Sequence, residues 1–290
     1  MWSKKWSSVL FNLHALFADP AVQAAVLPFI VALVLCYGLS FIWQRGLLLG
    51  SVGGFLAAVY VISGLNLVPL NATNKVILLG LLAIPLSILL EFLKSTKGRS
   101  LVLTGVALAA IIWVFWPVLS RQTALQNLFL VAISTLYLAL VLVLTSRLWQ
   151  SPVFGSSLSL QLAVASGGVA LLGATALYAQ LGFALAAVLG AYLLVVLLRV
   201  QTQTVGPSLN TQALALNLWI GIIPPVAHVY ASLPWYTFMA LLAMLIVPLF
   251  LAEKFKRNPW VLLVWSVLLA LPGFCAAFYL TWRVTGTPPL

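Results

Sequence analysis

Acidic residues are nearly absent from this sequence: Asp19, Glu91 and Glu253 are the only three in 290 residues. Lipid-linked transferases that use magnesium need clustered aspartates as metal ligands, and a single aspartate cannot supply them. Histidine is as scarce, because His14 and His228 are the only two and lie far apart in the chain. That scarcity argues against a zinc site or a pair of haem ligands. We therefore expect no metal and no cofactor.

Catalytic motifs are missing as well. Intramembrane proteases use Gly-x-Ser-Gly or Gly-x-Gly-Asp, and the sequence contains neither pattern, nor a glycine-rich phosphate loop. Cys36 and Cys275 lie inside apolar runs, where cysteine behaves as a small hydrophobe rather than as half of a disulfide or metal pair. We expect that the protein is not an enzyme, and catalysis by neutral Ser, Asn or Tyr side chains stays an open alternative.

Charge of either sign is rare. Charged residues make up 6% of the chain and apolar residues 64%, and the mean hydropathy is +1.18. A soluble protein carries roughly a quarter charged residues to cover its surface, so the main solvent of this chain must be lipid. The net charge of +11 would suggest nucleic acid in a soluble protein. Here the basic residues flank apolar runs, where they meet anionic headgroups, so the expected partners are membrane lipids and not nucleic acid.

Apolar windows long enough to cross about 30 Å of hydrocarbon recur along the chain. The ten predicted spans are residues 21–43, 47–66, 76–93, 100–119, 124–146, 157–178, 181–200, 213–232, 235–252 and 260–282. The connections between them are too short to fold as soluble domains. The predicted fold is an all-α polytopic helix bundle that forms a single transmembrane domain over residues 21–290.

Residues 1–20 form a segment of a different kind. Trp2 and Trp6 recur at helical spacing, with Lys4 and Lys5 on the opposite side. This pattern predicts an amphipathic helix that lies in the membrane interface with its tryptophans at headgroup depth. Polar residues interrupt the apolar core that a signal peptide would need, so we expect no cleavage.

Basic residues are divided unequally between the two sides of the predicted bundle. Loops after odd-numbered spans carry Arg45, Lys94, Lys97, Arg99, Arg147, Arg199, Lys254, Lys256 and Arg257; the other side carries Lys4, Lys5, Lys75, Arg121 and Arg283. The positive-inside rule places the first set in the cytoplasm and both termini outside. The basic N-terminal segment argues the other way, because such lysines usually seek the anionic cytoplasmic leaflet. The predicted location is the cytoplasmic (inner) membrane of a bacterium.

Small residues repeat at intervals of about four positions in three of the spans. The stripes are Gly46, Gly50, Gly54 and Ala58; Ser159, Ala163 and Gly167; and Gly182, Ala186 and Gly190. Such stripes let helix backbones approach closely. We expect them to pack within the chain, and homo- or hetero-oligomerisation through them is the alternative.

Two consecutive stretches of the sequence resemble segments of other membrane proteins. The run from Tyr178 to Ala191, Tyr-Ala-Gln-Leu-Gly-Phe-Ala-Leu-Ala-Ala-Val-Leu-Gly-Ala, is similar to a segment of a group of uncharacterised bacterial multi-span membrane proteins. The stretch from Asn217 to Pro234 resembles the segment that follows it in that group. The resemblance covers approximately residues 175–235. It implies an inner-membrane protein and no particular activity.

The polar residues of the eighth span (213–232) mark the candidate site. Paired prolines remove two backbone donors near the middle of this span. The favoured interpretation is a simple kink packed against a neighbour, and the functional alternative is a broken helix whose freed carbonyls line a wet cavity, as in many transporters. A buried histidine is likewise more often structural than a proton carrier. The candidate lining residues of this span are Asn217, Trp219, Gly221, Pro224, His228 and Tyr230, and Pro225 is the second proline of the pair.

A weak parallel repeat, 47–119 against 213–282, completes the candidate site. Ile84-Pro85-Leu86 and Val247-Pro248-Leu249 end spans three and nine, each followed by an acid and basic residues. An even separation of six spans means that both helices run in the same direction. The repeat would align Gly53 and Gly54 with the paired prolines, so we add these glycines to the candidate lining residues. Chance similarity between apolar helices is the competing explanation.

The function that best fits these features is transport of a small solute or a lipid, through a site beside span eight. A chain of ten spans and 290 residues resembles drug/metabolite transporters in size. That family's cytoplasmic termini conflict with the distribution of basic residues, so none of its functional residues is carried over. The alternative is a non-transporting scaffold or assembly subunit that buries its small-residue stripes against a partner.

Overall fold

The computed structural model describes residues 19–42, 46–64, 68–93, 95–173, 175–200, 213–231, 233–251 and 258–286. Every regular element in these ranges is a helix and none is a strand, which confirms the predicted all-α fold. The predicted interfacial helix falls on residues 1–18, outside the described ranges.

The elements follow the predicted spans closely, with differences of a few residues at their ends. In chain order they are η1 (Val22–Val26), α2 (Leu27–Ile42), α3 (Gly46–Ser63), α4 (Ala72–Glu91), α5 (Thr96–Leu119), α6 (Ala124–Leu148), α7 (Pro152–Leu172), α8 (Ala176–Val200), α10 (Leu214–Ala231), α11 (Thr237–Leu251) and α12 (Pro259–Thr285).

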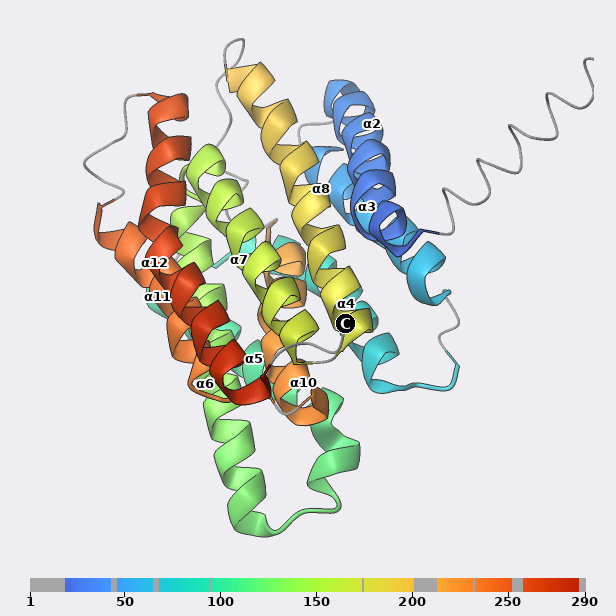
Figure 1. Ribbon diagram of the computed structural model, residues 1–290. Coiled ribbons are helices and arrows are strands. Elements are labelled where there is room, and N and C mark those ends of the chain that lie inside the picture. Colours follow the sequence, from blue (N-terminus) through green and yellow to red (C-terminus); the bar gives the residue numbers. More distant parts are fainter. Residues whose placement is uncertain are drawn as a thin grey trace, which may run out of the picture.

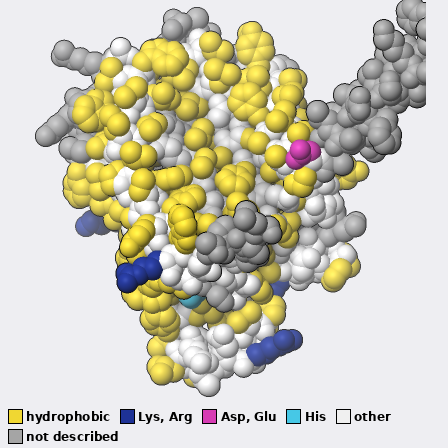
Figure 2. Space-filling model, in the orientation of Figure 1, with side chains coloured by type: hydrophobic (Ala, Val, Ile, Leu, Met, Phe, Trp, Pro, Cys, Tyr) yellow, Lys and Arg dark blue, Asp and Glu magenta, His cyan; other side chains and the backbone are white. Residues whose placement is uncertain are grey.

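Nine helices in the described ranges are long and apolar enough to cross a membrane, with η1 and α2 counted as one. The remaining predicted span, the ninth, corresponds to α11, which has 15 residues. At 1.5 Å per residue it covers about 22 Å, less than the hydrocarbon thickness. The protein is thus a multi-pass integral membrane protein, and the face drawn in Figure 2 is covered largely by hydrophobic side chains.

Helix α10 occupies the centre of the bundle. It packs against α4, α6, α7 and α8, and every residue from 213 to 227 is buried. Helix α8 has α2 and α3 on one side and α7 on the other, and α7 in turn packs against α12 (Figure 1). The eighth span, which the sequence marks as the candidate site, is therefore the helix most enclosed by the others.

Local sequence signals explain where several helices begin. Asn71 accepts a hydrogen bond from the Asn74 backbone N–H (2.8 Å) at the start of α4, and Ser95 accepts one from the Gly98 N–H (3.3 Å) at the start of α5. Asn258 caps α12 in the same way. Each cap satisfies a backbone donor that the first helical turn leaves free.

Proline explains the unusual first element. Pro28 has no N–H to donate to the carbonyl of Ala24, and its ring crowds that carbonyl. The backbone widens there into the π-helical turn η1, in which the Leu27 N–H donates to the Val22 carbonyl. A π-turn of this kind lets the helix continue past a residue that an α-turn cannot accommodate.

A second proline is compensated by a buried lysine. Pro117, near the end of α5, cannot donate to the carbonyl of Trp113, its expected partner four residues earlier. Lys75, from the first turn of α4, donates to that carbonyl instead, at 2.9 Å from Nζ to oxygen. The lysine is only 9% exposed. Lys75 therefore joins α4 to α5 besides contributing positive charge at this end of the bundle.

The small-residue stripes pack inside the chain. A Cβ atom at Gly50 would lie 2.5 Å from the backbone N of Cys36, and one at Gly54 would lie 2.5 Å from the Cβ of Ala32, so α3 meets α2 along its stripe. A Cβ at Gly182 on α8 would lie 2.6 Å from the Cα of Gly167 on α7. Side chains at these positions would hold the helices apart, which is why the stripes consist of small residues.

We expect Gly182→Ala to destabilise the protein by roughly 1–3 kcal/mol, because the added methyl meets backbone that cannot move aside. Gly190→Ala, on the same helix, is the matched control. Its Cβ would have ordinary contacts only, the nearest at 3.5 Å from Leu160. Thermal unfolding in detergent should separate the two variants. Equal stability of both would show that the α7–α8 contact is looser than the geometry indicates.

Candidate functional site

A chain of buried hydrogen bonds leads to the polar end of α10. The indole Nε1 of Trp149, directly after α6, donates to the Ser159 hydroxyl on α7 at 3.0 Å. Ser159 donates in turn to the Asn217 Oδ1 on α10 at 2.8 Å. The three side chains are buried, so each bond satisfies groups that lipid and apolar neighbours could not. They hold the Asn217 side chain in one orientation.

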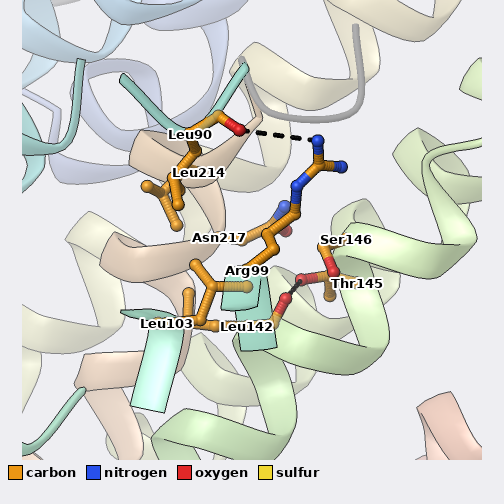
Figure 3. Close-up of a pocket in the computed structure, with 8 residues that line it drawn as sticks. All are labelled: Leu90, Arg99, Leu103, Leu142, Thr145, Ser146, Leu214 and Asn217. Atoms are coloured by element: carbon orange, nitrogen blue, oxygen red, sulfur yellow. Dashed lines mark hydrogen bonds between the residues drawn. The ribbon is translucent and has the colours of Figure 1, made fainter. Parts of the chain in front are cut away.

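Asn217 also borders a narrow pocket of about 10 Å³ between the ends of four helices, which is room for about one water molecule. Helices α4, α5, α6 and α10 contribute its walls. The lining residues are Leu90, Arg99, Leu103, Leu142, Thr145, Ser146, Leu214 and Asn217 (Figure 3). This pocket is the candidate functional site.

Arg99 supplies the charge of the pocket. It lies in the first turn of α5 and extends its guanidinium towards the end of α4, as Figure 3 shows. One Nη atom donates to the carbonyls of Leu90 (3.5 Å) and Leu93 (3.4 Å). Both distances are longer than a typical N–H···O bond of about 2.9 Å. Its Nε atom is buried and has no hydrogen-bond partner, so the guanidinium retains capacity for a stronger acceptor.

Two hydroxyl groups lie beside the cation. Thr145 donates to the Val141 carbonyl at 2.7 Å, and Ser146 donates to the Val143 carbonyl at 2.7 Å. Because each hydroxyl proton is used within α6, the oxygens can still accept hydrogen bonds. Leu103 and Leu142 form the apolar end of the pocket, away from the guanidinium (Figure 3). The arrangement suits an anionic group, and a ligand larger than a water molecule could enter only if the helix ends moved apart.

Trp219, one of the predicted lining residues, is enclosed by protein. Its side chain is 1% exposed. The indole Nε1 donates to the Val76 carbonyl on α4 at 3.0 Å, and the ring lies against Phe55 of α3 with centroids 4.4 Å apart. A Cβ on Gly80 would lie 1.8 Å from the indole, so the ring occupies a slot that this glycine leaves open. Trp219 thereby fixes α10 to α4 and α3.

The predicted glycines are divided between two contacts. Gly53 and Gly54 face α2, where the nearest side chains are Leu35 and Ala32. Gly221 faces α6, where Leu138 and Val141 are its nearest neighbours. The structure therefore brings spans two and eight together through Phe55 and Trp219 rather than through Gly53 and Gly54.

The alternative of a broken helix in span eight does not fit the structure. Helix α10 runs without interruption from Leu214 to Ala231 and contains both Pro224 and Pro225. Both prolines are buried, within a run from 213 to 227 in which every residue is buried. Proline keeps a helical φ angle and costs only its donor and some crowding. We attribute the unbroken helix to the close packing of α4, α6, α7 and α8 around it, which outweighs that local cost.

His228 and Tyr230 lie at the opposite end of α10 from Asn217. His228 occupies the last turn of the helix. Its Nδ1 donates to the Leu233 carbonyl, and its ring meets Phe238 of α11 edge to face at 5.7 Å. Tyr230 is 45% exposed. His228 thus holds the turn between α10 and α11, apart from the pocket.

The two proline segments of the predicted repeat have different surroundings. Pro85 is on the exposed side of α4, whereas Pro248 is buried in α11. Helix α4 packs on α10, and α11 packs on α12, α6 and α7. The repeat itself stays a prediction.

Of the predicted lining residues only Asn217 borders the pocket. Sequence reasoning used Arg99 for orientation alone and did not single out Thr145 or Ser146. A signal was present, because a serine cap followed by a first-turn arginine places a cation where α5 begins. Within the described ranges, no three His, Cys, Asp or Glu side chains lie close enough together to hold a metal ion.

Comparison with known proteins gives no match: no protein-family model fits the sequence, and no curated protein is significantly similar to it. The resemblance of residues of about 175–235 to a bacterial group stays an expectation.

Proposed function

We propose that the protein is a transporter for a small anionic solute or an anionic lipid and that Arg99 and Asn217 bind the anionic group of this substrate when the helix ends around their pocket move apart. One observation carries the proposal. A guanidinium with an unpartnered, buried Nε lies in a pocket between four helices, beside an oriented amide and two hydroxyls. A planar guanidinium recognises carboxylate or phosphate through two parallel hydrogen bonds.

The weak bonds of Arg99 suggest how binding is linked to movement. The guanidinium joins the start of α5 to the end of α4 through two contacts of 3.4–3.5 Å to neutral carbonyls. An anion in the pocket offers a charge-assisted acceptor, which forms shorter and stronger bonds. Binding would therefore release the end of α4 from Arg99. Differential affinity of this kind can shift the equilibrium between two arrangements of α4 and α5.

Passive transport or exchange fits the chain better than proton-driven pumping. The three acidic residues of the sequence are Asp19, Glu91 and Glu253. Asp19 precedes η1 and Glu91 ends α4, so neither lies at mid-membrane, and Glu253 is outside the described ranges. A proton pump normally uses a carboxylate within its spans.

A scaffold or assembly subunit is the alternative function. It would bind a partner through small-residue stripes that face outwards. Gly50, Gly54 and Gly182 instead pack against α2 and α7 of the same chain. A scaffold would therefore have to bind its partner through another surface.

The proposal is tested by measuring binding of defined anions to the purified protein. Inorganic phosphate and succinate represent solutes, and dihexanoyl-phosphatidylglycerol represents lipids. We expect at least one of them to bind, and Arg99→Gln to weaken its binding roughly 10- to 100-fold, as expected for loss of a hydrogen-bonded charge. Arg121→Gln, in the loop after α5, removes the same charge and should bind like the parent. Unchanged binding by Arg99→Gln, or no binding of any probe, would refute the proposal.

A further inference from the structure

A second, larger hollow lies on the outer face of the α5–α6 pair. Its volume is about 620 Å³. It is lined by Thr96, Lys97, Ser100, Leu101, Thr104, Gly105 and Arg147. We refer to this hollow as the α5–α6 groove. We propose that it binds the headgroup and one acyl chain of an anionic phospholipid.

The groove and the inner pocket are different sites on opposite faces of α5. Arg99 and Leu103 are four residues apart and face the inner pocket. Lys97, Leu101 and Gly105 are also spaced by four and face the groove. Residues three or four apart share one side of a helix, so α5 has an inward face with one cation and an outward face with another.

Charge at one end of the groove fits a phosphate. Lys97 in the first turn of α5 and Arg147 in the last turn of α6 approach it from two helices. None of the seven described residues that line it is acidic. Ser100, about one turn along α5 from Lys97, adds a hydroxyl to the lining. Two cations from different helices on one groove indicate an anionic ligand.

The rest of the groove fits an acyl chain, which favours a lipid over a free anion. Leu101 is 76% exposed and Gly105 presents no side chain, with nothing within 4 Å of a Cβ built there. The same face of α5 continues into the membrane through Leu108 and Ile112, both partly exposed. A soluble anion has no apolar part to bury against this strip of α5, so the strip would not strengthen its binding. A phospholipid buries its chain along it while its phosphate stays between Lys97 and Arg147.

The inference is tested by titrating phosphatidylglycerol into the purified protein and counting bound lipids by native mass spectrometry. The Lys97→Gln/Arg147→Gln double variant should bind the first lipid roughly 25-fold more weakly, about fivefold for each charge. Gly105→Phe leaves both cations in place but fills the apolar strip of α5 on which the acyl chain would lie, so it should also weaken lipid binding. Because these positions are exposed, the variants should unfold at the temperature of the parent.

The matched control is Arg121→Gln/Arg283→Gln, which removes two charges away from the groove and should leave binding unchanged. Equal losses in this control and in the groove variant would overturn the proposal, since the effect would then be one of net charge. Displacement of phosphatidylglycerol by an equal concentration of inorganic phosphate would overturn the lipid assignment. Arg99→Gln separates the two sites: intact lipid binding supports the groove whatever the fate of the transport proposal, and lost binding assigns the lipid to the inner pocket.

Discussion

Gly80→Ala is expected to prevent normal folding or to lower the free energy of unfolding by about 3 kcal/mol or more. A Cβ at this position would lie 1.8 Å from the Trp219 indole. The ring cannot move aside, because its Nε1 is bonded to the Val76 carbonyl and its face packs against Phe55. One methyl group would therefore separate α4 from the central helix. Folded yield and thermal unfolding in detergent would measure the loss.

Two further variants show whether this clash is the cause. Gly105→Ala makes the same chemical change on α5 where nothing lies within 4 Å, so it should be close to neutral. Trp219→Leu, combined with Gly80→Ala, removes the ring that the new methyl meets. The double variant should be more stable than Gly80→Ala alone, a non-additive effect typical of residues in contact. Independent, additive losses would mean that Trp219 does not occupy the slot over Gly80.

The helix ends could be predicted from the sequence because they carry local signals. Ser95 and Asn258 precede their helices as capping residues, and Pro259 follows one of them at the first helical position. Polar and basic residues interrupt the apolar windows between helices. These signals depend only on neighbours in the chain, and the observed bounds of α5 and α12 differ from prediction by four residues or fewer.

The direction in which each helix faces could not be predicted in the same way. In a soluble protein the apolar face of a helix marks its buried side. Here lipid and protein interior are equally apolar, so exposed Leu101 and buried Leu103 carry the same signal. The contact of Trp219 with Val76 joins positions 143 residues apart and leaves no pattern in the chain. The small-residue stripes were the exception, because close backbone approach requires a specific residue type.

The residues of the candidate site were equally hard to predict, because their roles depend on how the helices face one another. Asn217 stood out because an amide is rare in an apolar span, and it does border the pocket. Arg99 was indistinguishable from the other cations that mark helix ends. Only the packing of α4 against α5 shows that its guanidinium turns inwards to the Leu90 carbonyl. Paired Pro224 and Pro225 suggested a break because their local cost is plain, whereas the tertiary packing that keeps α10 intact is not visible in the sequence.

Lys75→Met is expected to destabilise the protein by roughly 2 kcal/mol, and Pro117→Ala should remove most of that effect. In the parent, Lys75 supplies the hydrogen bond that Pro117 cannot give to the Trp113 carbonyl. Methionine fills a similar volume but leaves this carbonyl without its donor, and a lost bond to a charged group costs about 1.5–3 kcal/mol.

Alanine at position 117 restores a backbone N–H that can donate to the Trp113 carbonyl, four residues earlier in α5. In that background the lysine is no longer needed, and its removal also relieves the cost of a cation that is only 9% exposed. The double-mutant cycle should therefore give a coupling energy of about 1–2 kcal/mol between two residues that join α4 to α5. Unfolding of the four proteins by denaturant in detergent measures it. A coupling near zero would show that Lys75 stabilises the fold through something other than the Trp113 carbonyl.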